Sequence, residues 1–227
     1  VRYCFVKNGA DAAWWRGYAG RGRFGTEKAR MTALRKPVGM TVAEFHEWEP
    51  EEHPDRRWQL FDGEPVSMAP ASPNHQRIHA EAAYLLTGHL RERRPECAVL
   101  VAPGVVPRVR SAINHRVPDL GVTCAPPAAG GEVGTDPVLL VEILSPSNER
   151  LTRANVWAYT TIPSVAEILL LGGVRVEAEV LRRGADGSWP EAPVFLGAED
   201  ELELASIGFR APLRSFYRTT SLLAARR

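Results

Sequence analysis

Residues 138–147 read Val-Leu-Leu-Val-Glu-Ile-Leu-Ser-Pro-Ser, an apolar run that contains a single acidic residue, Glu142. An apolar run of this length, closed by a Ser-Pro-Ser turn, predicts a strand over 138–144. A carboxylate within such a strand is costly unless a cation or hydrogen-bond donors stabilise it. Asp119, in Val-Pro-Asp-Leu at 117–120, is a second acid beside an apolar, strand-type segment. These two acids are the first candidates for a functional site.

The segments on either side of this strand predict a domain with both helices and strands. Thr41 and Glu44 have the spacing of a capping box, which predicts a short helix. The pair Asp62-Gly63 between two strand-like segments predicts a β-hairpin over 58–68. Apolar periodicity and end signals predict helices over 74–93, 149–160 and 213–217. Further strands are expected at 97–102, 105–110, 118–124, 168–171, 174–181, 192–196 and 201–205. This order predicts a mixed α/β or α+β domain with one central sheet.

The length of 227 residues predicts one domain with an appendage. Residues 1–39 are expected to be a disordered N-terminal extension or a mis-called start, 40–220 the domain, and 221–227 a C-terminal tail. Residues 1–30 hold seven Lys/Arg and two Asp/Glu, a net charge of +5, whereas the other 197 residues hold 21 and 25, a net charge of −4. The first segment could therefore also be a basic aromatic arm that touches nucleic acid, but bulk positive charge does not attract a partner to the main domain.

Composition gives the expected compartment. No stretch approaches the roughly 18 apolar residues of a membrane-spanning helix, and residues 1–30 lack the apolar run of a signal peptide. A cytoplasmic protein without a membrane partner is therefore expected. Cys4, Cys97 and Cys124 are an odd number without metal-ligand spacing. They predict reduced thiols, with Cys97 and Cys124 in the core.

The two acids predict a metal site if their strands are neighbours in the sheet. The carboxylates of Asp119 and Glu142 would then converge at one edge, and the backbone carbonyl of Ile143 could complete the protein ligands. Hard oxygen donors of this kind suit Mg²⁺ or Mn²⁺. Such a metal can lower the pKa of a bound water and neutralise charge on a phosphate. The alternative is two strand-end carboxylates that face solvent.

Several short motifs in a fixed order carry a family resemblance. They are Phe61-Asp62-Gly63-Glu64, Ser72-Pro73-Asn74-His75-Gln76, Val117-Pro118-Asp119-Leu120, Val141-Glu142-Ile143-Leu144-Ser145-Pro146-Ser147, Tyr159 and Ile162-Pro163-Ser164. Over roughly 40–215 the chain resembles the Uma2 (DUF820) endonucleases of the PD-(D/E)XK superfamily. The resemblance implies a restriction-endonuclease-like fold, a mixed sheet flanked by helices. It also implies hydrolysis of nucleic-acid phosphodiester bonds with Mg²⁺ or Mn²⁺, with DNA as the first partner to consider and a homodimer as an assembly to consider.

The same resemblance assigns roles to residues and exposes a departure from the pattern. Asp119 becomes the motif aspartate, Glu142 the acid of the following strand, and Glu64 an additional acid from the hairpin. The superfamily lysine would fall at Leu144. The family's alternative lysine, on the following helix, falls at Asn155. No lysine can supply this site from the rest of the domain, because the three lysines of the chain all lie within its first 36 residues.

The missing lysine predicts a weakened or inactive nuclease. Asn155 can hydrogen-bond a water but brings no charge. Arg153 is charged, but on a helix it points about 160° away from Asn155, and its planar fork copies an ammonium poorly. The loss of one charge-stabilising donor commonly costs about two to three decades of rate. The alternatives are a catalytically dead nuclease fold that binds nucleic acid or a partner protein, and a structural domain in which Asp119 and Glu142 are incidental.

Three further residues are candidates for contact with nucleic acid. His75 and Gln76 lie near a predicted helix N-terminus, where free backbone N–H groups attract phosphate. Arg116 lies on a basic stretch that leads to Asp119. The alternatives are helix-start histidines without a ligand and a solvated strand edge. His75 and His79, four residues apart, would need a third ligand to bind a metal.

Overall fold

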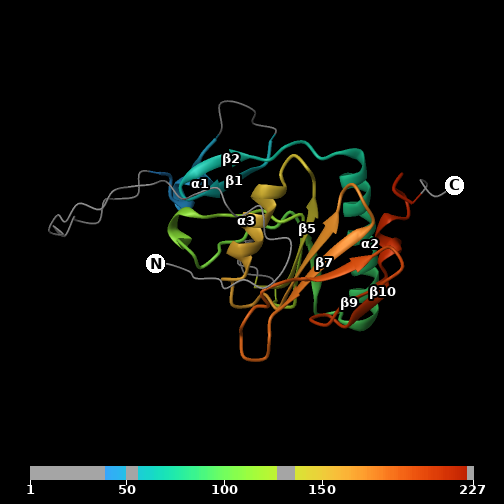
Figure 1. Ribbon diagram of the computed structural model, residues 1–227. Coiled ribbons are helices and arrows are strands. Elements are labelled where there is room, and N and C mark those ends of the chain that lie inside the picture. The colour runs from blue at the N-terminus through green and yellow to red at the C-terminus, as the bar shows by residue number, and fades with distance from the viewer. Residues whose placement is uncertain (1–38, 50–55, 127–135, 224–227) are drawn as a thin grey trace, which may run out of the picture. The chain divides into compact units, whose positions relative to one another are not determined.

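The computed structural model describes residues 39–49, 56–126 and 136–223 (Figure 1). All of them belong to the unit Pro37–Arg227. The expectations for residues 1–38 and for the last four residues of the tail lie outside the described residues. Within the described part of the chain, no helix is both long and apolar enough to cross a membrane.

A six-stranded mixed sheet forms the centre of the domain, as the sequence predicted. The strand order is β3-β4-β5-β6-β7-β8. Neighbouring strands are antiparallel except β5 and β6, which run parallel. The bounds are β3 Ala98–Val101, β4 Leu120–Thr123, β5 Pro137–Leu144, β6 Glu167–Gly172, β7 Glu177–Arg182 and β8 Val194–Gly197. The apolar run at 138–144 is thus an inner strand.

The side chains of β5 alternate between two hydrophobic cores. One core includes apolar residues of α2 (Pro73–Arg93) and every second residue of β5, namely Leu139, Val141 and Ile143. The other core contains Leu140 and Tyr159, the last residue of α3 (Glu149–Tyr159). Successive side chains of a strand point to opposite faces. Glu142 is in step with Leu140 and therefore points to the face that α3 covers.

Local signals place the elements that precede the sheet. Thr41 forms the predicted capping box with Glu44 at the start of α1 (Val42–Glu47). Asp62 and Gly63 have positive φ angles of 47° and 89° between β1 (Trp58–Phe61) and β2 (Glu64–Ser67). Such angles at both central positions fit a tight two-residue hairpin turn. Helix α2 begins after Ser72, whose hydroxyl accepts a hydrogen bond of 3.2 Å from the N–H of His75.

Two elements differ from the sequence prediction. The strand expected at 105–110 is a single bridge between Val105 and Arg116, followed by a 3-10 turn, η2 (Ser111–Ile113). Pro107 has no N–H to donate to a strand partner, and Arg110 adopts a left-handed φ of 46°, so the ladder cannot continue. At the C-terminus, β9 (Glu201–Leu204) pairs with an unpredicted strand, β10 (Phe209–Pro212), before η3 (Leu213–Tyr217).

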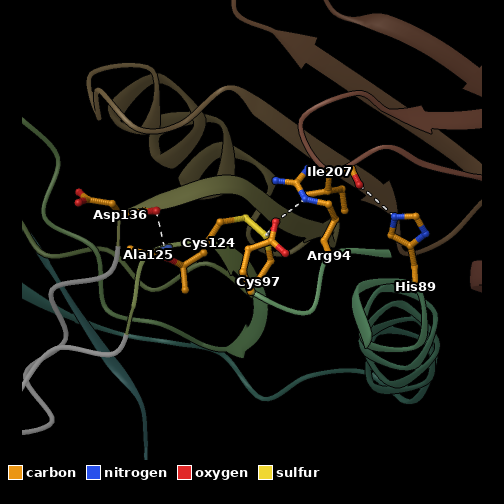
Figure 2. Close-up of a disulfide and its surroundings, with 9 residues drawn as sticks. His89, Arg94, Cys97, Cys124, Ala125, Asp136 and Ile207 are labelled. Carbon is orange, nitrogen blue, oxygen red and sulfur yellow. Dashed lines mark hydrogen bonds and ion pairs between the residues drawn. A yellow bond between two sulfur atoms is a disulfide. The ribbon is translucent and has the colours of Figure 1, made fainter. Parts of the chain in front are cut away.

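The expectation of reduced thiols is wrong for two cysteines. Figure 2 shows a disulfide between Cys97 and Cys124, with an S–S distance of 1.97 Å. The antiparallel register pairs Ala98 with Thr123, so the next residues outward, the two cysteines, face each other across β3 and β4. Spacing along the chain does not reveal this pairing. The expected burial of Cys97 is confirmed, because 8% of its surface is exposed.

Candidate functional site

The two acids meet where β4 begins and β5 ends. The antiparallel register pairs Leu120 with Val141, so its continuation by one residue places Asp119 opposite Glu142. The Oδ2 atom of Asp119 accepts a hydrogen bond of 2.7 Å from the backbone N–H of Ile143. Like charges that lie directly opposite on neighbouring strands destabilise a sheet. An acid pair here requires donors or a cation.

Glu142 is held by donors from α3. Its side chain lies in the interior, where its Oε1 atom accepts hydrogen bonds from the Tyr159 hydroxyl at 2.7 Å and from Asn155 Nδ2 at 3.2 Å. Burial, followed by the charge of Asp119, raises the pKa of Glu142 to about 8, although the two donors oppose this shift.

Asn155 bridges β5 and the hairpin. Its Nδ2 atom also donates to Gln59 Oε1 at 3.1 Å, and Gln59 Oε1 accepts from the N–H of Val117 at 3.2 Å. Asn155 is 3% exposed, and its Oδ1 atom has no hydrogen-bond partner within the described part of the chain. Position 155, where the resemblance implies a lysine, thus places an uncharged amide beside Glu142.

Two histidines of α2 reach Asp119 from the other side. The Nε2 atom of His75 lies 3.0 Å from Asp119 Oδ1, and the Nε2 atom of His79 lies 3.0 Å from the backbone oxygen of Asp119. The structure thus shows His75 in contact with Asp119. Its expected contact with phosphate stays a prediction. Gln76 lies beside the site and donates to the backbone oxygen of Ala71 at 3.1 Å.

A cleft of about 1060 Å³ opens over these groups. The hairpin, the segment after it, the start of α2 and the start of α3 form its walls. Its charged and polar lining includes both acids, both histidines, Gln59, Gln76 and Asn155. Three arginines, Arg56, Arg57 and Arg150, also line the cleft. The cleft thus combines a buried Glu142 and a partly buried Asp119 with guanidinium groups that can attract an anionic ligand.

Arg153 does not join the acid pair. Its guanidinium donates to both carboxylate oxygens of Glu179 on β7, at 2.5 and 2.6 Å, and lies 3.3 Å from Glu149. These contacts raise the pKa of Arg153 and fix its side chain toward β7. The helical geometry predicted this divergence from Asn155, and the position gives no support to Arg153 as a substitute for lysine.

Glu64 and Arg116 also lie apart from the lining of the cleft. Glu64 is exposed at the start of β2. Arg116 is 5% exposed, donates to the backbone oxygen of Leu60 at 2.5 Å and stacks over the ring of Phe61. Burial lowers the pKa of Arg116 to about 10, while Tyr159 and Asp62 act in the opposite direction. The guanidinium of Arg116 is thus a structural group beneath the hairpin, which corrects the expectation of a substrate-facing arginine.

The oxygen atoms of the acid pair suit a hard divalent cation. Asp119 and Glu142 supply carboxylate oxygens, which are the ligands that such a cation prefers. The N–H of Ile143 points toward β4, and in an extended strand the carbonyl of the same residue points the same way. Continuing the register by two residues places Pro118 opposite Ile143, and Pro118 has no N–H that could bond to this carbonyl. Among the described residues, no group of three or more His, Cys, Asp or Glu side chains is arranged to hold a metal.

Several site residues carry no strong sequence signal. Tyr159 is four residues after Asn155, so it shares a helix face with Asn155 and could have been assigned to the site. Gln59, Arg56 and Arg57 belong to the hairpin region, and nothing in their local sequence indicates that they line the cleft or that Gln59 contacts Asn155. His79 lies one helical turn after His75, but its partner is a backbone atom. Such contacts depend on segments that are distant in the chain.

A family model described as "Putative restriction endonuclease", Uma2, matches residues 42–214 of the chain, which is 173 of its 227 residues. The chain is also 30% identical, over 181 residues, to the uncharacterized protein slr1290 of Synechocystis sp.. That alignment covers 79% of this chain and 92% of the Synechocystis protein.

A solved structure gives the same fold. It is described as a "putative nuclease belonging to DUF820" from Anabaena variabilis, and it superposes with a TM-score of 0.61. The match covers 79% of this chain and 98% of the other, at 14% sequence identity. At this level of identity the likeness concerns the fold, and it confirms the predicted nuclease-like architecture.

Proposed function

Since the chain belongs to the Uma2 family, whose model is described as "Putative restriction endonuclease", we propose that it is a metal-dependent endonuclease that hydrolyses phosphodiester bonds of nucleic acid. The acid pair Asp119 and Glu142 at the base of an arginine-lined cleft carries the proposal. We expect DNA as the substrate. A homodimer is the assembly to test, by native mass measurement.

The proposed cofactor is Mg²⁺ or Mn²⁺, held by the carboxylates of Asp119 and Glu142 and by the backbone carbonyl of Ile143. When bound, such a cation activates a water and neutralises charge on the phosphate. Tyr159 and Asn155 hold Glu142 in place for this role. Because burial and the charge of Asp119 raise the pKa of Glu142, a bound cation would favour the ionised form of its carboxyl group.

The cleft supplies groups for the rest of the substrate. Arg56, Arg57 and Arg150 can pair with phosphates on either side of the bond to be cut. Gln76, in the first turn of α2, can add a further donor, whereas His75 in the same turn faces Asp119. Asp119, at the base of the cleft, is 13% exposed in its side chain. The scissile phosphate must therefore enter the cleft, which favours a flexible or single-stranded segment over a rigid duplex.

The amide at position 155 sets the expected rate. A lysine there would add a positive charge beside Glu142, whereas Asn155 adds a neutral donor. We therefore propose slow cleavage. The second candidate function, a non-cutting protein that binds nucleic acid or a partner protein, is favoured by this same substitution.

Restoring the charge tests the proposal. We expect Asn155→Lys to raise Mn²⁺-dependent cleavage by about 100- to 1,000-fold over the wild type. Cleavage would be measured on plasmid DNA, single-stranded DNA and RNA. Arg153→Lys is the matched control, because it adds a lysine on the same helix that points to Glu179 and should leave cleavage unchanged.

The outcomes separate the two functions. Loss of cleavage in Asp119→Ala would support the assignment of the acid pair. Equal cleavage by the wild type and Asp119→Ala would point to a contaminating nuclease and remove the evidence for an enzyme. Binding of Mn²⁺ and nucleic acid without cleavage, even in a folded Asn155→Lys variant, would favour the non-cutting protein.

A further inference from the structure

Two histidines, one helical turn apart, both contact Asp119. His75 Nε2 lies 3.0 Å from the side-chain oxygen Oδ1, and His79 Nε2 lies 3.0 Å from the main-chain oxygen. Residues four apart on a helix lie on the same face. Between them, Ile78 anchors α2 in the core with no exposed surface. Helix α2 thus presents a fixed pair of imidazoles to the residue at the start of β4.

The chemistry of the acceptors determines which imidazole nitrogen carries the proton. A main-chain carbonyl can only accept, so His79 must carry a hydrogen on Nε2. As a ligand of the proposed cation, the Asp119 carboxylate can likewise only accept, so His75 donates from Nε2 to Asp119. Both histidines therefore act as donors to one acidic residue.

All three oxygen atoms of Asp119 have at least one donor. Oδ2 accepts from the N–H of Ile143 at 2.7 Å, and Oδ1 accepts from His75. The main-chain oxygen accepts from the N–H of Ala102 at 2.9 Å as well as from His79. The carboxylate cannot rotate without losing a hydrogen bond, and each carboxylate oxygen retains a lone pair for a cation.

We propose that His75 is a positioning residue that orients the Asp119 carboxylate for cation binding, and that His79 fixes the backbone beneath it. This inference rests on the metal site of the proposed function. Hydrogen-bond partners of metal-binding carboxylates typically contribute about 10- to 100-fold to metal affinity. His75 donates a hydrogen bond to Asp119 from α2, as Tyr159 and Asn155 donate hydrogen bonds to Glu142 from α3.

A titration of Tm with Mn²⁺ tests the role of His75. A bound cation raises Tm, and the concentration at which the rise begins reports the affinity. We expect this concentration to be about 10- to 100-fold higher in His75→Ala than in the wild type. We expect His75→Gln to recover most of the affinity, because the terminal amide of glutamine offers an N–H donor where His75 has Nε2.

His89 provides a matched control on the same helix. Its Nε2 atom contacts the backbone oxygen of Ile207 at 3.0 Å, a contact drawn as a dashed line in Figure 2, and His89 does not line the cleft. His89→Ala removes a similar hydrogen bond and should lower Tm without metal, while its response to Mn²⁺ should match that of the wild type. An equal loss of affinity in His75→Ala and His89→Ala would attribute the effect to helix stability and overturn the inference.

Other results separate this inference from the proposed function. If the wild type and His75→Ala respond to Mn²⁺ at the same concentration, His75 has no positioning role and the metal site stands. If His75→Gln is as weak as His75→Ala, the imidazole itself is required and the hydrogen-bond explanation fails. If the wild type shows no response to Mn²⁺, both the metal site and the role of His75 are rejected.

Discussion

At the scale of single residues, the site consists of carboxylate oxygens that are oriented by donors from two helices. Glu142 Oε1 receives a phenol and an amide from α3, and Asp119 Oδ1 receives an imidazole from α2. These donors remove rotational freedom from the acids, which would lower the cost of ordering the proposed metal site.

Tyr159→Phe tests the donor to Glu142. The ring stays, but Glu142 loses a buried hydrogen bond, so we expect the free energy of unfolding to fall by about 1–2 kcal/mol. Denaturant unfolding without metal measures this loss. Tyr217→Phe is the control, because the Tyr217 hydroxyl donates at 2.7 Å to the backbone oxygen of Glu177, outside the cleft. We expect both variants to be destabilised but only Tyr159→Phe to respond differently to Mn²⁺. An unchanged Mn²⁺ response in Tyr159→Phe would argue against its place in the site.

His115 predicts a pH dependence of stability. Burial, then the charges of His46 and Arg116, lowers the pKa of His115 to about 4 from an ordinary value of 6.5. Between pH 6.5 and 4 the unfolded chain binds a proton that the folded chain excludes, so stability falls as the pH falls through this window. After allowance for partial exposure of the ring, the loss should be roughly 2 kcal/mol. Denaturant unfolding at several pH values would show a shallower slope in His115→Gln, and equal slopes would contradict this assignment.

At the scale of elements, two opposite faces of helix α3 make contacts, one with Glu142 in the site and the other with β7. Asn155 and Tyr159 face Glu142, whereas Arg153 pairs with Glu179 on β7. The helix is therefore attached to β5 and β7 at once. This attachment explains why the charged neighbour of Asn155 is not available to the cleft.

Arg153→Ala tests the attachment of α3 to β7. Glu179 is 7% exposed, so removal of Arg153 leaves a buried carboxylate without its bidentate partner. We expect a loss of about 1–3 kcal/mol in the free energy of unfolding, with cleavage and Mn²⁺ affinity close to those of the wild type. A large loss of cleavage in a variant with normal stability would restore Arg153 as a catalytic candidate. Arg150→Ala, on the cleft side, should show the reverse pattern of normal stability and weaker nucleic-acid binding.

The elements that the sequence predicted well are those with strong local signals. The capping box at Thr41, the turn at Asp62-Gly63 and the cap at Ser72 each involve neighbouring residues, so local chemistry suffices. The strand expected at 105–110 failed because Pro107 and the left-handed Arg110 outweigh its apolar pattern. The strand β10 was missed because its stability comes from pairing with β9.

At the scale of the whole molecule, the site joins segments that lie far apart in the chain. Asp119 and Glu142 could be predicted because carboxylates are unusual beside apolar strands. Gln59, which contacts Asn155 at a separation of 96 residues, could not, because its sequence carries no sign of that partner. The contact of His75 with Asp119 depends in the same way on how α2 packs against the sheet.

The disulfide predicts a redox dependence of stability. It links Cys97 and Cys124, 27 residues apart, and closure of a loop of that length stabilises a domain by about 3 kcal/mol in the chain-entropy model. We expect a reducing agent to lower Tm by roughly 5–10 °C, measured by calorimetry. The double variant Cys97→Ala, Cys124→Ala should melt like the reduced wild type and should not respond to the reducing agent. A reducing agent that leaves the wild-type Tm unchanged would argue against a stabilising disulfide.

Helix α3 connects the parallel strands β5 and β6, so a side chain that faces the site can change on this helix while the strands stay the same. The side chain at 155 belongs to this connecting helix, whereas β5 itself keeps an apolar Leu144 at its end. A substitution at 155 therefore alters no strand pairing and no residue of the two hydrophobic cores. Under the proposed function, a single codon on α3 would therefore set the rate of cleavage, independently of the strands that build the sheet.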